Sequence, residues 1–208
     1  MANNAVWSFL VVAVVVVALS QTATASDPDI LSDFIVPANM SAGEIDGSFF
    51  TYTGIRGIFA RTVEKFTVTK VSKAEMAALD GQSVSYAVLQ YPAGGSVNPP
   101  HTHPRAAELL LVADGCLEVG LVDSTNKLYT QTLVIGDMFV FPKGLVHYQY
   151  NAYANQSATA ISAFGSASAG TVSLPTTLFA TGVDDEVLAK SFKTDVSTIH
   201  KIKAGFAH

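Results

Sequence analysis

Cysteine is almost absent from this chain of 208 residues, and Cys116 is its single representative. One thiol excludes an internal disulfide, so stability has to come from core packing, a bound metal or association between chains. Cys116 stands between Gly115 and Leu117. We interpret it as an inert buried strand residue, because unpaired cysteine is among the most buried residue types. A reactive thiol and a bridge between two chains are the alternatives.

Basic residues are also scarce. The chain carries 12 Lys and Arg against 17 Asp and Glu, which is a formal net charge of −5, and the basic residues form no cluster. A mildly acidic surface without a basic patch argues against nucleic acid or an anionic membrane as a partner. Neither an internal repeat nor a low-complexity linker interrupts the chain. These absences favour an ordinary globular protein.

No Lys or Arg precedes the apolar run at residues 6–19, where the N-terminal amine supplies the only positive charge. The run is short for a membrane-spanning helix, which needs ~20 residues. The small residues Ala23-Thr24-Ala25 follow it. This layout predicts a secretory signal peptide over residues 1–25, a mature start at Ser26 and release to the extracellular space. An uncleaved anchor is the alternative.

Short β-rich runs dominate the middle of the chain. Their spacing of roughly 8–12 residues between turns indicates an antiparallel sandwich or barrel rather than alternating strand–helix units. Predicted strands cover residues 85–91, 108–112, 116–122, 129–135, 138–141, 147–153 and 158–164. We therefore predict an all-β fold, with one domain at 26–208 and a barrel core at about 60–170.

Few elements are expected outside the barrel. Residues 26–39 suggest an irregular arm, and 49–58 suggest a short strand pair. Ser72 and Glu75 form the pattern of a capping box, which predicts a short helix that ends before Gly81.

Two more helices are predicted between residues 183 and 205. The acidic residues 184–186 begin the first, and residues 194–195 can cap the second. Its apolar stripe is expected to pack on the barrel or on another subunit. His200 and His208 lie in this region, and we expect exposed or packing roles for both.

Three of the five histidines and one glutamate stand at spacings that suit a metal ion. His101 and His103 are two residues apart, so on a strand both imidazoles project from the same face. Glu108 opens the next strand, and His147 follows a tight turn at Pro142-Lys143-Gly144. Three imidazoles and a carboxylate suit manganese, iron, nickel, copper or zinc. Four protein ligands leave two positions of a six-coordinate ion open for water, oxygen species or substrate.

The residues around these histidines resemble a known family. Both motifs of the cupin superfamily are matched at every specified position by Gly95-x5-His101-x-His103-x4-Glu108-x6-Gly115 and Gly136-x5-Pro142-x-Gly144-x2-His147-x3-Asn151. The run Pro99-Pro100-His101-Thr102-His103-Pro104-Arg105 and the start Asp27-Pro28-Asp29 are similar to those of plant germin-like proteins.

The resemblance implies a single jelly-roll barrel with short C-terminal helices. It also implies one manganese ion (Mn2+) per chain, held by His101, His103, Glu108 and His147. Further implications are secretion to the apoplast, association with the cell wall, a role in plant defence and a homo-oligomer, namely a hexamer built as a trimer of dimers. Two sequons predict glycosylation of Asn39 and Asn155.

Two departures from the family pattern affect the expected function. Most germins carry a disulfide near the N-terminus, but Ile35 stands where its first cysteine would align, so we expect no disulfide. Oxalate-oxidising members hold oxalate with two asparagines near the metal. Asn98 fits the first, whereas the second aligns with Val88, which cannot donate a hydrogen bond. A site that lacks a needed donor loses much of its affinity, which disfavours oxalate oxidation.

Three functions are therefore compared. The first is a manganese oxidoreductase of small oxygen species, similar to a superoxide dismutase, in which Asn98 orients a bound oxygen ligand. The second is a non-catalytic binding, structural or storage-type wall protein on the same fold. The third is an oxalate oxidase.

Overall fold

A computed structural model describes residues 27–206. The predicted signal peptide at 1–25, the predicted mature start at Ser26, and His208 all lie outside these residues. Within them, none of the helices combines the length and the apolar character that crossing a membrane requires.

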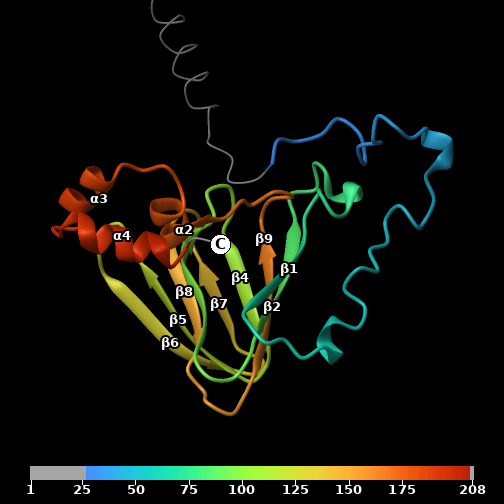
Figure 1. Ribbon diagram of the computed structural model, residues 1–208. Coiled ribbons are helices and arrows are strands. Elements are labelled where there is room, and N and C mark those ends of the chain that lie inside the picture. Colours follow the sequence, from blue (N-terminus) through green and yellow to red (C-terminus); the bar gives the residue numbers. More distant parts are fainter. Residues whose placement is uncertain (1–26, 207–208) are drawn as a thin grey trace, which may run out of the picture.

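Two five-stranded antiparallel sheets face each other (Figure 1). The first has the order β1-β2-β9-β4-β7, formed by Thr67–Val71, Ser85–Tyr91, Ala158–Phe164, Glu108–Asp114 and Met138–Phe141. The second has the order β10-β3-β8-β5-β6, formed by Val172–Ser173, Ser96–Thr102, Val146–Asn151, Cys116–Val122 and Leu128–Val134. The all-β barrel prediction is confirmed, while the predicted domain limits remain a prediction.

Alternation along the strands fills the space between the sheets. On β4, Leu110 and Val112 are buried, whereas the neighbouring Leu109 is 41% exposed. On β5, Leu117 and Val119 complete the same core. Side chains two residues apart lie on one face of a strand, so each strand contributes every second residue to the interior. The core therefore occupies the barrel, and the outer face of β4 stays partly apolar.

Most predicted strands lie within one or two residues of the observed ones. The exact bounds 85–91, 116–122, 138–141 and 158–164 recur in β2, β5, β7 and β9. Strands β1 and β10 were not predicted, because one is short and partly polar and the other has two residues. Cys116 lies on a strand as expected but is only partly buried.

The strand pair predicted at 49–58 is wrong. This segment forms turns and leads to the 3-10 helix η2 (Ile58–Ala60). Phe49 and Phe50 pack on Phe34 of the N-terminal arm, with ring centroids 6.1 and 5.1 Å away. Aromatic packing within the arm therefore replaces the expected cross-strand pairing.

The helix predicted from the capping box is also wrong in type. Glu75 does accept hydrogen bonds from the Ser72 nitrogen (2.8 Å) and hydroxyl (2.6 Å). Met76 then adopts an extended backbone (φ −138°, ψ 96°), so only the 3-10 helix η3 (Ala77–Leu79) follows. The cap is present, but too few residues continue it to form an α-helix. A further 3-10 turn, η1, covers Ala42–Glu44.

Both predicted C-terminal helices are present as α3 (Asp185–Ser191) and α4 (Val196–Ala204), capped by Asp184 and Asp195. A third helix, α2 (Leu174–Phe179), was not predicted. The three helices share a small core of their own, in which Ile199 is fully buried. Ile202 of the predicted stripe is still 38% exposed, so packing of the stripe on the barrel or on another subunit stays a prediction. His200 contacts Asp185 (2.7 Å) on the exposed side of this unit.

Candidate metal centre

A bulge in β3 places two functional residues on one face of the strand. Asn98 pairs with Gln149 of β8, and His101 pairs with His147, so three steps on β3 oppose two on β8. In a regular strand, residues three apart such as Asn98 and His101 would point to opposite faces, and the extra residue of the bulge brings them to one face. The bulge lies at Pro99-Pro100, which cannot donate hydrogen bonds to the ladder.

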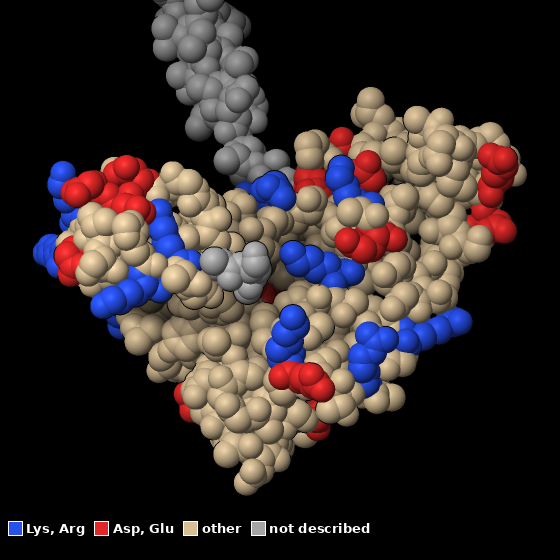
Figure 2. Space-filling view, in the orientation of Figure 1, with Lys and Arg blue, Asp and Glu red and all other residues tan. Residues whose placement is uncertain are grey.

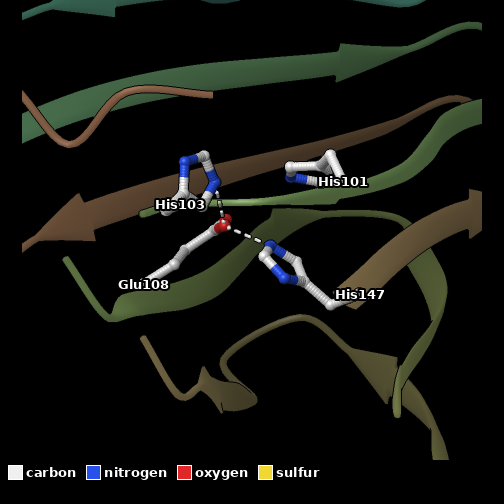
Figure 3. A group of neighbouring side chains, drawn as sticks. All are labelled: His101, His103, Glu108 and His147. Atoms are coloured by element: carbon white, nitrogen blue, oxygen red, sulfur yellow. Dashed lines mark hydrogen bonds and ion pairs between the residues drawn. The ribbon is translucent and has the colours of Figure 1, made fainter. Parts of the chain in front are cut away.

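The four predicted ligands meet inside the barrel (Figure 3). Ligand atoms of His101, His103, Glu108 and His147 all lie within 4.8 Å of one another, and all four residues are buried. Glu108 is the first residue of β4, His147 is the second residue of β8, and His103 follows the end of β3 by one residue. The Phe141 ring stacks on His147 at 4.3 Å and fixes its plane. The sequence pattern therefore identified a group that the fold brings together.

Backbone carbonyls contact Nδ1, the ring nitrogen that points away from the cluster, in each of its three histidines. Nδ1 of His101 contacts the Pro99 carbonyl (2.8 Å), Nδ1 of His103 the Gly170 carbonyl (2.5 Å) and Nδ1 of His147 the Leu145 carbonyl (2.8 Å). A carbonyl only accepts, so Nδ1 carries the proton in the neutral imidazole. Nε2 is then left with its lone pair, which is the tautomer that a metal ligand needs.

These lone pairs converge on a carboxylate. Nε2 of His103 and Nε2 of His147 lie 3.0 and 3.1 Å from the same Oε2 of Glu108. The other oxygen, Oε1, accepts a hydrogen bond from Ser162 (2.5 Å). Acceptors at this distance repel one another unless a proton or a metal cation lies between them. The donor set therefore fits a metal ion, and this conclusion rests on the convergence of the ligand atoms rather than on the sequence motif.

Burial and neighbouring groups tune the protonation of the cluster. Burial lowers the pKa of His101 to about 4, and the nearby His147 acts in the same direction. Burial alone would raise the pKa of Glu108, but contacts with His103, His147 and Ser162 lower it to about 2. At neutral pH the cluster thus contains a neutral His101 and a carboxylate, as metal binding requires.

The shifted pKa of His101 predicts acid sensitivity in the metal-free protein. Between the ordinary value of 6.5 and the folded value of about 4, the unfolded chain binds the proton better. The free energy of unfolding should therefore fall by about 3 kcal/mol as pH drops from 6.5 to 4. Urea unfolding across this range measures the change. A His101→Gln variant should lose this part of the decline and a His200→Gln variant should keep it; an identical decline in all three proteins would contradict the assignment.

A polar group lies beneath the cluster, and the sequence reading missed part of it. Asn98 donates to Oε1 of Gln149 (2.7 Å), and the Tyr91 hydroxyl lies 3.4 Å from the same atom. Gln149 is fully buried, and its Nε2 has no partner among the described residues. The available signal was alternation, because Gln149 is two residues beyond His147 and shares its face. Gln149 therefore fixes the amide of Asn98 beside the cluster.

The structure corrects the role given to Val88. On β2, Ala87 and Leu89 belong to the barrel core and line the same cavity as the cluster, whereas Val88 lies on the opposite face. That outer face also carries Gln90, which donates to the Ile58 carbonyl of the arm (3.0 Å). The positions on either side of Val88 offer no second donor, because neither Ala87 nor Leu89 can donate a side-chain hydrogen bond, and the Ser85 hydroxyl already donates to the Ser166 carbonyl (2.6 Å).

The N-terminal arm supports the loop beside the cluster. Asp27 accepts hydrogen bonds from the Ser166 hydroxyl (2.6 Å) and the Ala167 nitrogen (2.7 Å). The same loop continues to Gly170, whose carbonyl holds His103. The arm is therefore attached without a disulfide, by a carboxylate and by the packing of Ile30 and Ile35 near Gly81.

Replacing Asp27 by Ala should lower the free energy of unfolding by about 2 kcal/mol. The change removes two hydrogen bonds to a charged group and leaves the buried Ser166 hydroxyl without the acceptor of its proton. Chemical denaturation at pH 7 measures the loss. Asp29→Ala is the matched control, since its carboxylate makes no hydrogen bond among residues 27–206. Equal stability of the two variants would contradict this role for Asp27.

Comparisons with known proteins agree with the fold and the cluster. Residues 60–200 match the cupin family. A recombinant oxalate oxidase solved in complex with glycolate superposes with a TM-score of 0.78 at 31% identity, covering 88% of this chain and 98% of that chain. Two facing sheets with the His-x-His, Glu and His cluster between them define a cupin.

Full-length similarity gives the family within that class. Germin-like protein 9-3 of Oryza sativa subsp. japonica is 60% identical over 202 residues, which is 94% of each chain. Putative germin-like protein 9-2 of the same organism is 62% identical over 184 residues, covering 86% of this chain and 85% of the relative. The chain belongs to the germin-like proteins.

Proposed function

We propose that this protein is a secreted manganese germin-like protein that acts as an oxidoreductase on small oxygen species, in the manner of a superoxide dismutase. The observation that carries the proposal is the convergence of three Nε2 lone pairs and one carboxylate at a buried point that borders a cavity. Such a ligand set leaves coordination positions open toward the cavity.

A bound manganese ion would supply a one-electron couple that oxidises one superoxide to dioxygen and reduces the next, with two protons, to hydrogen peroxide. The protein's own contribution is positional. The three carbonyl contacts to Nδ1 hold the imidazoles in the ligating tautomer, and Ser162 holds Glu108. Asn98, fixed by Gln149, lines the cavity at the cluster and can orient a small oxygen ligand.

Superoxide removal by metal-quantified protein tests the proposal. The manganese-loaded protein should accelerate dismutation, and a His103→Ala variant should not. The alternative is a non-catalytic binding, structural or storage-type wall protein, in which the metal stabilises the barrel. It is favoured if the fully loaded protein is as inactive as the variant and both assemble alike.

Oxalate oxidation is the second enzymatic candidate, supported by the likeness to the oxalate oxidase structure. The apolar side chains of Ala87 and Leu89 argue against it, because Asn98 is then the sole asparagine among the described residues that line the cavity. Oxalate-dependent peroxide release by the same samples distinguishes the two activities.

The remaining expectations join this proposal. Asn39 and Asn155 are both exposed, which supports their use as glycosylation sites in a secreted, apoplastic protein with a defence role. A homo-oligomer is supported by the apolar outer face of β4 and β7, where Met138 and Val140 are each 55% exposed. Light scattering on a trimer of dimers would give a particle mass equal to that of six chains.

A further inference from the structure

The cavity at the cluster is much larger than an oxygen species. It has a volume of about 370 Å³ and extends from His101, His103 and Glu108 to the barrel mouth. A water molecule takes about 30 Å³ of liquid volume, and superoxide has two heavy atoms. Most of the cavity is therefore available to a larger ligand.

The walls of this cavity change in character along its length. At the metal end they carry the cluster and Asn98. Apolar walls adjoin this end: the Phe164 ring lies 4.8 Å from the His103 ring between centroids, and Ala87 and Leu89 line the same space. Apolar walls between two polar ends suit a ligand with a hydrocarbon body and polar termini.

The mouth carries one basic side chain. Lys70 of β1 pairs with Ala87 of β2, so it shares the cavity face with that residue, and it lines the cavity. Lys70 forms no ion pair with any residue in the range 27–206. Glu75, whose pKa it lowers only weakly, is held by Ser72. Figure 2 shows other Lys and Arg side chains on the same face, interspersed with acidic ones.

Strand register indicates the distance between the two ends. Lys70 pairs with Ala87, Ala87 with Ser162, and Ser162 with Leu110 of the strand that carries Glu108. Leu110 is two residues from Glu108, so three strand spacings and this step put the backbone positions of Lys70 and Glu108 about 16 Å apart, with the cavity between them.

We propose that this cavity binds a small organic dianion with an apolar body, a substrate class that rests on the metal centre of the proposed function. One carboxylate lies at the metal end beside Asn98, the methylene chain lies against Ala87, Leu89 and Phe164, and the second carboxylate pairs with Lys70. Adipate, a six-carbon linear dicarboxylate, has such a body and two such ends and serves as the probe. Lys70 is then a specificity-determining residue.

Calorimetry on the manganese-loaded full chain with adipate and hexanoate tests this proposal. The two probes share their length and differ in the distal carboxylate. Adipate should bind about fivefold more tightly, a preference that weakens with added salt. Adipate should also perturb the electron paramagnetic resonance signal of the bound manganese. Lys70→Gln should abolish the preference, and Lys127→Gln, a lysine outside the cavity, should leave it intact.

Equal affinities for the two probes, a preference retained in Lys70→Gln, or no binding of adipate at millimolar concentration would each overturn the inference. A superoxide assay on the same samples separates the two claims. Adipate binding by a protein that does not remove superoxide supports the inference while the proposed activity fails. Superoxide removal by a protein that does not bind adipate supports the proposed activity while the inference fails.

Discussion

Replacing Glu108 by Gln should lower manganese affinity by about 100-fold or more. Glu108 is the only carboxylate in the cluster, it is 1% exposed, and one of its oxygens faces two imidazole nitrogens. The amide keeps the shape but removes the negative charge that offsets the cation. Metal content after dialysis, measured by mass spectrometry of the eluted metal, should fall from one ion per chain to nearly none.

The same variant should fold normally without metal. The amide N–H of a glutamine can donate to the lone pair of His103 or His147, which removes the repulsion between acceptors. The melting temperatures of the metal-free proteins should therefore agree, while the increase on adding manganese disappears in the variant. Glu118→Gln, an exposed position on β5, is the control and should keep its metal. Retention of one tightly bound ion by Glu108→Gln would show that the cluster is not the metal site.

Replacing Ala87 by Asn should raise oxalate-dependent peroxide formation at least about tenfold. Ala87 lines the cavity at the cluster, and an asparagine there would supply the second donor beside Asn98. A site that can hydrogen-bond a polar substrate turns it over far more efficiently than a site that offers only an apolar wall. Steady-state kinetics with oxalate, at equal manganese content, measure the effect.

Val88→Asn is the matched variant on the neighbouring position. Its side chain points to the outer face, where it is 3% exposed, so it adds a buried polar group without reaching the cavity. Oxalate turnover should stay at the wild-type level, and the free energy of unfolding should fall by about 1–3 kcal/mol. Equal oxalate turnover by Ala87→Asn and the wild type, with both fully loaded, would contradict this account of the second donor.

Only spatial information separates these two positions. Both are small apolar residues in one strand, and a shift of one residue along a strand moves a side chain to the other face. The face of β2 is set by its pairing with β9, which places Ala87 opposite Ser162, the partner of Glu108. The sequence shows no such pairing, so the alignment with the family pattern led to Val88 instead of Ala87.

The bulge in β3 likewise decides which residues share a face, and the sequence does not show it. Counting residues would put Asn98 and His101 on opposite faces, yet the register shift at Pro99-Pro100 puts them on one. Similarly, Gln149 and Asp27 came to light only through their contacts, since each acts on partners that are at least 51 residues away in the chain.

The sequence by itself determined the fold class and the metal cluster. Strand alternation, turn spacing and the pattern of His101, His103, Glu108 and His147 are local features, and local features are legible along a chain. Tertiary structure decided which side chains share the cavity with that cluster. It placed Ala87 and Asn98 there and excluded Val88, because the direction in which a strand side chain points depends on the pairing in the sheet and on bulges. The local sequence pattern therefore determined which residues form the centre, and the packing of the barrel determined the space available to its ligand.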